Sequence, residues 1–360
     1  MKLSKNITAL LFLLLFFSAC TKTYKPRPKY KANVTDLKAD VEIARFDLDF
    51  FSMDTADIAG GLEKLKAKHG NFVETFLVDI VNDRRPLPLD QIAKVLLSIP
   101  EAIQLEDSIK KAFPDLKFAE KEIKQMMAYK IHFFGEKISP VKKIFTFNTL
   151  YKYGTTTHED VLGLGLDFFL GENHVPYFSV EMLRPQYKRR TLTKEHITAS
   201  LASAIADNAV SYYSKAGGSK MIDMMLHEGK KFYVKACLMP ETADSIIYNF
   251  SDYQIKYCEY GETALWEHLG KENLLFSSKK SDFQKYVSEG PFNPKLDLPG
   301  NSASWLGAQM VAQAAGRLRK EMKANNPNQS IREIDRKVME IILKESNSQF
   351  FMQKYKPTKP

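Results

Sequence analysis

The feature that most constrains this chain is one hydrophobic run near its amino terminus, Ile7–Phe17, which has eleven residues. A helix that spans a bilayer needs about 20 consecutive apolar residues. The run is therefore too short to be a transmembrane anchor. With 44% hydrophobic and 12% aromatic residues, the remainder of the 360-residue chain has enough apolar side chains to bury a core. We expect it to fold as a globular protein.

The position of the run predicts export. It follows two lysines and precedes Ser18, Ala19 and Cys20, which is the order of charged, apolar and small residues in a secretory signal. Small residues directly before a cysteine resemble the bacterial lipobox, in which the thiol is acylated and becomes the new amino terminus. We therefore predict a signal peptide over residues 1–19 and fatty acyl chains such as palmitate on Cys20, which bind the bilayer. The alternative is an ordinary secretory signal that contains a cysteine.

Residues 20–40 are interpreted as the acylated cysteine and a basic, proline-rich tether. Thr21–Lys31 carries five cations and two prolines, and no acidic residue occurs before Asp36. Prolines favour extended backbone, and the cations attract anionic headgroups. The chain has a formal net charge of +9, most of which lies in the signal and the tether. An exported protein rarely meets nucleic acid, so we expect no nucleic-acid partner.

Residues 41–355 are predicted to form one α-rich globular domain. Residues 41–51 alternate apolar and polar side chains, as in a strand that leads into a short helix. Helical periodicity then dominates residues 57–130 and 194–349. Between them, residues 141–169 are rich in β-branched and aromatic residues and turn signals, which predicts a small antiparallel sheet. The fold class is thus α+β, predominantly α-helical, in a single domain.

Two features of this domain concern small side chains. Gly163 and Gly165 fall on one face of a predicted strand, where a neighbouring helix or ligand could approach closely. Cys237 and Cys258 are expected to be reduced and buried, although an envelope compartment would also permit a disulfide.

One helical segment carries half of a zinc-peptidase motif. Such a helix needs two histidines at positions i and i+4 and a glutamate after the first one, which acts as a base on the metal-bound water. His227 and Glu228 match the first half, but Lys231 stands at the second ligand position. A protonated ammonium has no lone pair and repels a dication, so the motif is broken.

Glu262, on a following helix, is placed where a third zinc ligand would stand. The sequence favours a different interpretation, in which Lys231 forms an ion pair with Glu228 or Glu262, because buried charges need partners. The remaining candidate histidines, His158, His174, His196 and His268, are scattered along the chain. Each is expected to be a surface or hydrogen-bonded residue.

A further segment mixes aromatic and basic residues. It runs from Asn173 to Phe178 and continues through Arg184–Arg190. Such a surface suits contacts with proteins or glycans. A solvated loop followed by a positively charged helix start is an equally good interpretation.

Seven motifs in order resemble the gliding-motility lipoprotein family GldB of Bacteroidetes. They are the lipobox, Arg45-Phe46-Asp47, Gly165–Gly171, Pro185-Gln186-Tyr187, Leu226–Lys231, Glu262–Trp266 and Ser304–Gly307. The resemblance implies an envelope lipoprotein required for surface gliding, which works with other gliding-motility or secretion-system envelope proteins. It also implies distant kinship with HExxH zinc-dependent proteases, and hence a zincin-like core.

Two functions follow from the residues and the resemblance. The first is a non-catalytic scaffold or binding component without a cofactor, with a candidate groove lined by His227, Glu228, Lys231, Glu262 and Trp266. The alternative is a zinc-dependent hydrolase of envelope peptides, with His227 and Glu262 as ligands and Glu228 as base. The residues after Cys20 form no acidic cluster, which favours a membrane-anchored protein that faces the periplasm.

Overall fold

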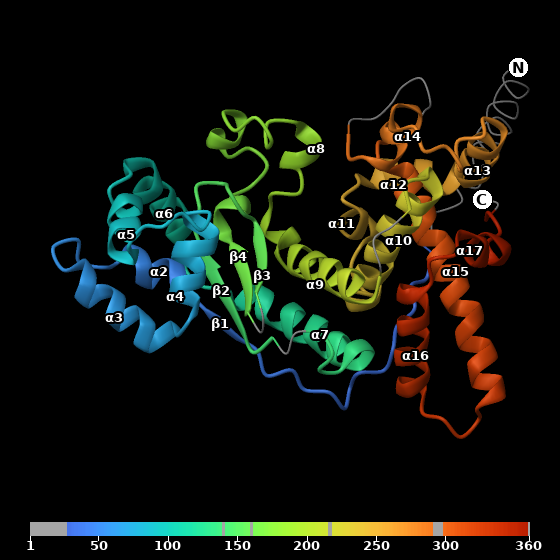
Figure 1. The fold of residues 1–360 in the computed structure, drawn as a ribbon, viewed down its shortest axis with the longest axis horizontal. Coiled ribbons are helices and arrows are strands. Elements are labelled where there is room, and N and C mark those ends of the chain that lie inside the picture. Colours follow the sequence, from blue (N-terminus) through green and yellow to red (C-terminus); the bar gives the residue numbers. More distant parts are fainter. Residues whose placement is uncertain (1–26, 139–140, 159–160, 215–217, 291–297, 359–360) are drawn as a thin grey trace, which may run out of the picture.

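A computed structural model describes residues 27–138, 141–158, 161–214, 218–290 and 298–358 (Figure 1). The predicted signal peptide and Cys20 lie outside the described residues. No helix in the described ranges is long and apolar enough to cross a membrane. As predicted, the fold is α+β and mostly helical.

The elements follow one another along the chain as helices around a small sheet. The strands are β1 (Glu42–Ala44), β2 (Lys143–Phe147), β3 (Thr155–His158) and β4 (Val161–Gly165). The helices before β2 are α2 (Phe46–Phe51), α3 (Ile58–His69), α4 (Phe72–Glu74), the π-helix η1 (Thr75–Val81), α5 (Leu89–Leu97), α6 (Pro100–Ala112) and α7 (Lys117–Phe134). Those after β4 are the 3₁₀-helices η2 (Leu166–Phe168), η3 (Val175–Phe178) and η4 (Lys194–His196), and the α-helices α8 (Gln186–Arg189), α9 (Ile197–Tyr213), α10 (Met221–Leu238), α11 (Asp244–Tyr248), α12 (Asp252–Tyr260), α13 (Glu262–Lys271), α14 (Lys280–Val287), α15 (Ser302–Asn325), α16 (Ile331–Lys344) and α17 (Ser348–Lys354).

The sheet is mixed, and the prediction of an antiparallel sheet was wrong. The strand order is β1-β2-β4-β3, and β1, β2 and β4 are parallel. Only β3 pairs in the antiparallel direction, with β4. The physical reason is burial: helices cover both faces of the sheet, and this arrangement favours parallel strands with apolar residues on both sides. The zincin-like core is not confirmed.

Two hydrophobic cores lie on opposite faces of the sheet. Ile144, Leu162 and Leu164 point into the larger core, which includes α7, α9, α10, α15 and α16. Phe145 and Phe147 point into the smaller core with α2 to α6. Figure 1 shows these first helices, in blue and cyan, gathered as a separate group on one side of the sheet. The sheet therefore joins two packed layers.

Gly163 and Gly165 lie on the face of β4 that borders the smaller core. A Cβ atom at Gly163 would lie 2.7 Å from a ring carbon of Phe147, and one at Gly165 would lie 3.0 Å from the same ring. The side chain of Thr156 on β3 lies as close to Gly163, and the backbone oxygen of Tyr153 lies closer still to Gly165. The groups that approach these glycines therefore belong to the sheet and to the loop before β3, and not to a neighbouring helix.

The centre of the larger core is the crossing of α10 and α15. A Cβ atom at Gly229 would lie 2.4 Å from the backbone carbon of Gly307, and one at Gly307 would lie 2.0 Å from the backbone oxygen of Met225. The two backbones thus touch directly. Both glycines belong to motifs noted in the sequence, so one reason for these motifs is helix packing.

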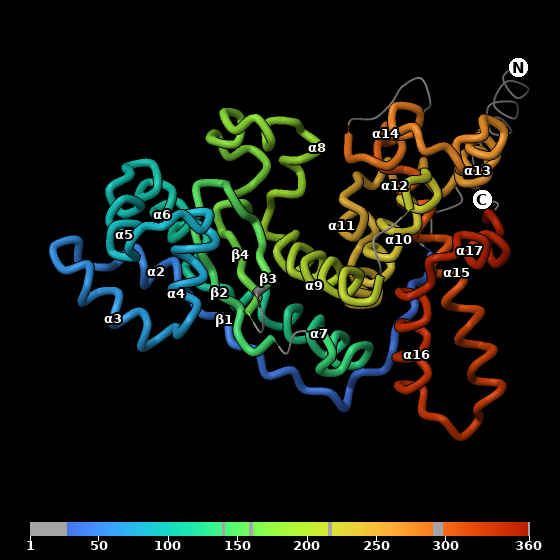
Figure 2. The backbone as a smooth tube through the Cα atoms, viewed as in Figure 1, coloured from blue at the N-terminus to red at the C-terminus, as the bar shows by residue number. Residues whose placement is uncertain are grey.

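The residues that precede β1 are packed against the domain. Residues 27–41, here called the arm, run past α16 and α7 to the edge of the sheet (Figure 2). Ala32 and Val41 are buried in the larger core. This corrects the predicted tether over residues 20–40, of which residues 27–40 belong to the folded domain. Cys237 and Cys258 are both buried and unpaired, as expected.

Candidate functional site

His227, Glu228 and Lys231 lie together on the outer face of α10. The ammonium of Lys231 is 3.0 Å from Oε1 of Glu228 and 3.2 Å from Oδ1 of Asp207 on α9. His227 Nε2 lies 4.0 Å from the same glutamate oxygen. The ion pair between Lys231 and Glu228 is one of the two pairs that the sequence predicted.

The charges around Lys231 affect its own pKa and that of its neighbour. Burial works against the charged ammonium, but Glu228 and Asp207 outweigh it and raise the pKa of Lys231. Burial and then the positive charge of Lys231 lower the pKa of His227. Lys231 therefore stays protonated and engages the carboxylate that would act as the base in a zinc peptidase. Within the described ranges, no three His, Cys, Asp or Glu side chains form a group that could hold a metal ion.

Glu262 begins α13 and is fully buried. Its Oε2 lies 2.6 Å from Nη2 of Arg27 in the arm, and its Oε1 accepts a hydrogen bond of 2.6 Å from the hydroxyl of Tyr355. The guanidinium of Arg27 also lies 5.4 Å from the ring centre of Trp305. One buried carboxylate therefore holds both the arm and the carboxy-terminal segment of the domain.

Trp266 lies one turn after Glu262 on α13. Its ring meets that of Tyr355 edge to face, with 5.1 Å between the centres. The five predicted groove residues are therefore divided between two places. His227, Glu228 and Lys231 gather around Asp207, whereas Glu262 and Trp266 gather around Tyr355, and the described residues show no hydrogen bond, ion pair or ring contact between the two groups.

A second buried carboxylate also holds the arm, and sequence reasoning missed it. Asp335 on α16 accepts hydrogen bonds from Tyr30 (2.8 Å), from Nε2 of His132 (2.8 Å) and from Nε of Arg319 (2.6 Å). The guanidinium of Arg319 also lies 3.5 Å from the ring centre of Tyr30. Burial alone would raise the pKa of Asp335, but His132 and Arg319 lower it below its ordinary value. The signal available in the sequence was an acidic residue within the apolar stripe of an amphipathic helix.

A third buried or half-buried contact also attaches the arm. Lys29 forms an ion pair with Asp244 at the start of α11. Arg27, Lys29 and Tyr30 thus each bind a different carboxylate, on α13, α11 and α16. Arg27 and Lys29, two of the basic residues that predicted a tether, are instead side chains by which the arm attaches.

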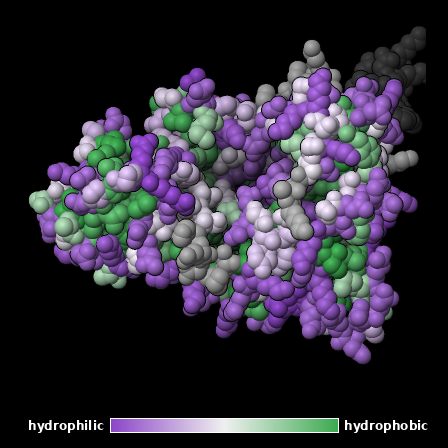
Figure 3. All heavy atoms as spheres, in the orientation of Figure 1, coloured by the Kyte–Doolittle hydropathy of each residue, from purple (hydrophilic) through white to green (hydrophobic). Residues whose placement is uncertain are grey.

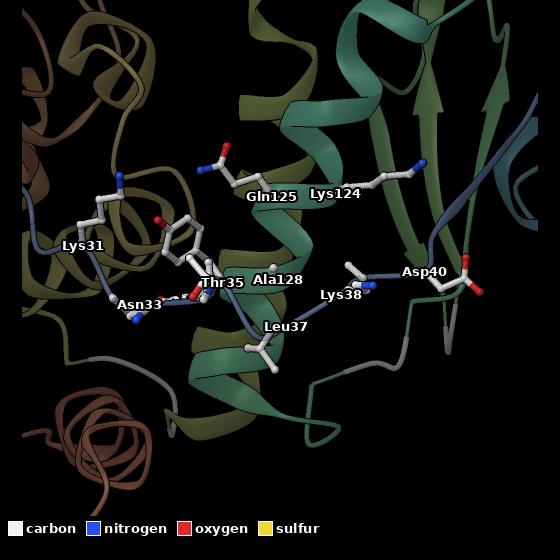
Figure 4. Close-up of a pocket in the computed structure, with 13 residues that line it drawn as sticks. Lys31, Asn33, Thr35, Leu37, Lys38, Asp40, Lys124, Gln125 and Ala128 are labelled. Atoms are coloured by element: carbon white, nitrogen blue, oxygen red, sulfur yellow. Dashed lines mark hydrogen bonds between the residues drawn. The ribbon is translucent and has the colours of Figure 1, made fainter.

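The arm borders two cavities. The first, of about 620 Å³, lies between Arg27–Tyr30 and the helices α10 and α15. The second, of about 920 Å³, lies between residues 31–40 and α7 (Figure 4). Figure 4 shows the arm crossing α7 near Gln125 and Ala128. Both cavities have the arm as one wall, so their shape depends on its attachment.

The other histidines have ordinary hydrogen-bond partners. His174 is bonded to Tyr151, His196 to Thr193 and His268 to Tyr286. This confirms the expectation for these three residues. The side chain of His158 lies outside the described part of the structure.

The aromatic and basic segment forms a projecting lobe. Residues 171–192, here called the α8 lobe, are closed at their base by a hydrogen bond of 2.9 Å from the backbone nitrogen of Gly171 to the oxygen of Leu192. In the lobe, the guanidinium of Arg189 lies 4.0 Å from the ring centre of Phe178. The segment is therefore an ordered surface that combines cations with aromatic rings.

Comparison with known proteins gives one match. A family model described as gliding motility protein GldB matches residues 27–357. No match is found among the curated proteins or the solved structures. The expected kinship with zinc-dependent proteases is not supported by these comparisons. The matched range includes the arm, both buried carboxylates and the α8 lobe.

Proposed function

The chain belongs to the gliding motility protein GldB family, and from this premise we propose that it is a lipoprotein of the cell envelope, anchored through Cys20, which serves gliding as a binding component. The observation that carries the proposal is the attachment of the arm at Arg27, only seven residues after Cys20. Seven residues span at most about 25 Å, whatever their conformation. An acylated Cys20 therefore keeps α13 and α15 close to the membrane surface.

A binding function is supported by the chemistry of α10. Lys231 neutralises Glu228, and Glu262, the proposed third ligand of the alternative, is occupied by Arg27 and Tyr355. The two carboxylates that the hydrolase alternative needs are thus engaged by other side chains of the domain. The partners of the domain are then other envelope proteins of the gliding or secretion apparatus, and the domain faces the periplasm.

The anchor is tested by replacing Cys20 with alanine. We expect Cys20→Ala to abolish labelling with radioactive palmitate, to release the protein from the membrane fraction and to stop gliding. The matched control is Thr21→Ser, which leaves the cysteine in place and should keep all three properties. The absence of palmitate label on the unmodified protein, or a Cys20→Ala protein that stays in the membrane fraction, would overturn the proposed anchor.

The binding function is tested by Glu228→Gln, which removes the only base that the alternative offers. We expect a Glu228→Gln strain to glide normally, because the half-buried ion pair with Lys231 adds little to stability. If gliding is lost while the variant protein is as abundant and as thermally stable as the unmodified one, the hydrolase alternative gains support over the binding function.

A further inference from the structure

The α8 lobe exposes large apolar side chains beside its cations. Val175 is 76% exposed, Phe178 44% and Met182 61%. The lobe also contains four basic residues and two acidic ones. Figure 3 shows hydrophobic atoms among hydrophilic ones on this projecting part of the surface. Apolar side chains beside cations are typical of surfaces that enter the headgroup region of a bilayer.

A cavity of about 240 Å³ separates the lobe from the start of α15. Met182, Lys188 and Arg190 line it from the lobe. Asn249, Glu289 and Asn301 are among the residues that line it from the rest of the domain. The exposed Met182 thus stands at the rim of a cavity that contains two cations.

The lobe wall of this cavity offers an unused hydrogen-bond donor. Arg190 donates one hydrogen bond of 2.6 Å to the backbone oxygen of Asn249, but its buried Nε has no partner in the described structure. On the opposite wall, Asn301 precedes the 24-residue helix α15, and its side chain does not cap the helix. The start of a long helix also carries a partial positive charge.

Within the described part of the chain, Arg190 has no direct ion pair at the cavity. Glu289, which also lines the cavity, forms an ion pair with Lys188. Glu289 and Glu172 act on Arg190 electrostatically, but neither forms an ion pair with it among the described residues. A bound anion against Arg190 would therefore give this partly buried cation a direct partner.

The cavity lies near the point at which the arm is attached. Arg27 contacts Trp305 and Gln309, which follow Asn301 by four and eight residues on the same helix. At about 1.5 Å per residue, these contacts lie about 6 and 12 Å from Asn301 along the helix axis. A membrane that holds Cys20 is thus within reach of the cavity. This step rests on the lipid anchor proposed above.

We propose that the cavity between the α8 lobe and the start of α15 binds the phosphate-bearing headgroup of an anionic phospholipid. The phosphate lies against Arg190, Lys188 and the first turn of α15. The apolar side chains of the lobe lie in the interfacial region of the same bilayer. The lipid anchor and this site then hold the domain at two points, which fixes its orientation on the membrane.

Hydrogen exchange on the acylated full-length protein tests the site. The protein is placed in vesicles of phosphatidylcholine alone and in vesicles that also contain phosphatidylglycerol. We expect phosphatidylglycerol to slow exchange several-fold at the amides of residues 301–304 and 188–192. The anchor is scored separately by flotation with the phosphatidylcholine vesicles, so failure of the anchor and failure of the site give different results.

Matched variants distinguish a specific binding site from general electrostatic attraction to an anionic membrane. Arg190→Gln and Lys188→Ala should abolish the protection, and Lys188→Ala changes only a partly exposed pair, so it leaves the fold intact. Arg184→Gln removes an exposed cation of the same lobe that does not line the cavity, and should keep the protection. The proposal is overturned if Arg184→Gln loses as much protection from exchange as the other two variants, or if phosphatidylglycerol does not slow exchange in the unmodified protein.

A final control experiment identifies the source of the phosphate. Inorganic phosphate is added to the protein in phosphatidylcholine vesicles. We expect no protection at millimolar concentration, because the apolar rim finds no acyl chains around a free ion. Full protection by inorganic phosphate alone would overturn the lipid assignment and leave a site for a free anion.

Discussion

Single buried carboxylates hold together segments that are far apart in the sequence. Glu262 binds Arg27 and Tyr355, and Asp335 binds Tyr30, His132 and Arg319. The sequence predicted that Glu262 needs a cation, because an unpaired buried charge is costly. It could not predict which cation, since the composition of a basic segment is the same whether the segment is solvated or bound.

Asp335 offers the clearest test at this scale. We expect Asp335→Asn to lower the free energy of unfolding by about 3 kcal/mol, because Arg319 loses its partner in a largely buried position. The matched control is Asp36→Asn, which breaks an exposed pair with Arg332 and should change the same quantity by less than about 1 kcal/mol. Urea denaturation of both variants measures the difference, and equal values would show that the Asp335 cluster adds nothing special.

Buried lysines make stability depend on pH in an unusual range. Burial lowers the pKa of Lys130, Lys230 and Lys235 to about 8, whereas an unfolded lysine titrates near about 10.4. Between these values the unfolded chain binds more protons, so stability rises with pH from 8 upward. Above about pH 9 the buried thiols oppose this trend, because burial raises the pKa of Cys237 and Cys258.

The measurement is the free energy of unfolding at pH 8 and pH 9. We expect it to increase between these values in the unmodified protein and to increase less in Lys235→Met. The control is Lys64→Met, at an exposed position of α3, which should keep the full increase. If the free energy of unfolding of Lys235→Met rises as much between pH 8 and pH 9 as that of the unmodified protein, the lowered pKa of Lys235 is contradicted.

Among the elements, helices were predicted well and the sheet was not. Apolar periodicity and proline stops indicate where helices lie, because both act within a few residues. Strand direction depends on which strands become neighbours. β1 pairs with β2 across about a hundred residues of helix, and no local signal in residues 141–169 reveals that partner. The motif Leu226–Lys231 was likewise interpreted from its polar residues alone. The structure shows that its glycine, Gly229, packs α10 against α15.

The crossing of α10 and α15 gives a test of that interpretation. We expect Gly229→Ala to lower the free energy of unfolding by about 1–3 kcal/mol, because the added methyl group overlaps the backbone of Gly307. Gly316→Ala on α15 meets no atom within 4 Å and should instead raise stability by up to about 1 kcal/mol, since alanine favours a helix. Changes of the same sign in thermal denaturation would contradict direct backbone contact at the crossing.

On the scale of the whole molecule, the arm links the two layers of the domain. It is attached to α13, α11 and α16 at one end and continues into β1, the edge strand of the sheet, at the other. Its place could not be predicted from the sequence, because three isolated contacts to distant carboxylates leave no periodic pattern. The candidate site was predicted in part, since the Lys231–Glu228 pair was foreseen and the division of the groove was not.

The attachment of the arm is tested by a double-mutant cycle. Arg27→Met leaves Glu262 buried without its cation, and should destabilise the protein more than Arg27→Met combined with Glu262→Gln does. We expect a coupling free energy of about 1 kcal/mol or more between the two positions. Additive effects in urea denaturation would mean that the ion pair does not hold the arm.

The arm also determines how the domain responds to mechanical load. If Cys20 is anchored and a partner pulls on the domain, the tension enters at Arg27 and reaches Lys29 and Tyr30 only after the first contact has opened. The three contacts therefore bear the force one after another, and the pairing of β1 with β2, into which the arm continues, is loaded after them. Such an attachment lengthens stepwise under strain while the helical core stays folded, and it closes again when the tension falls.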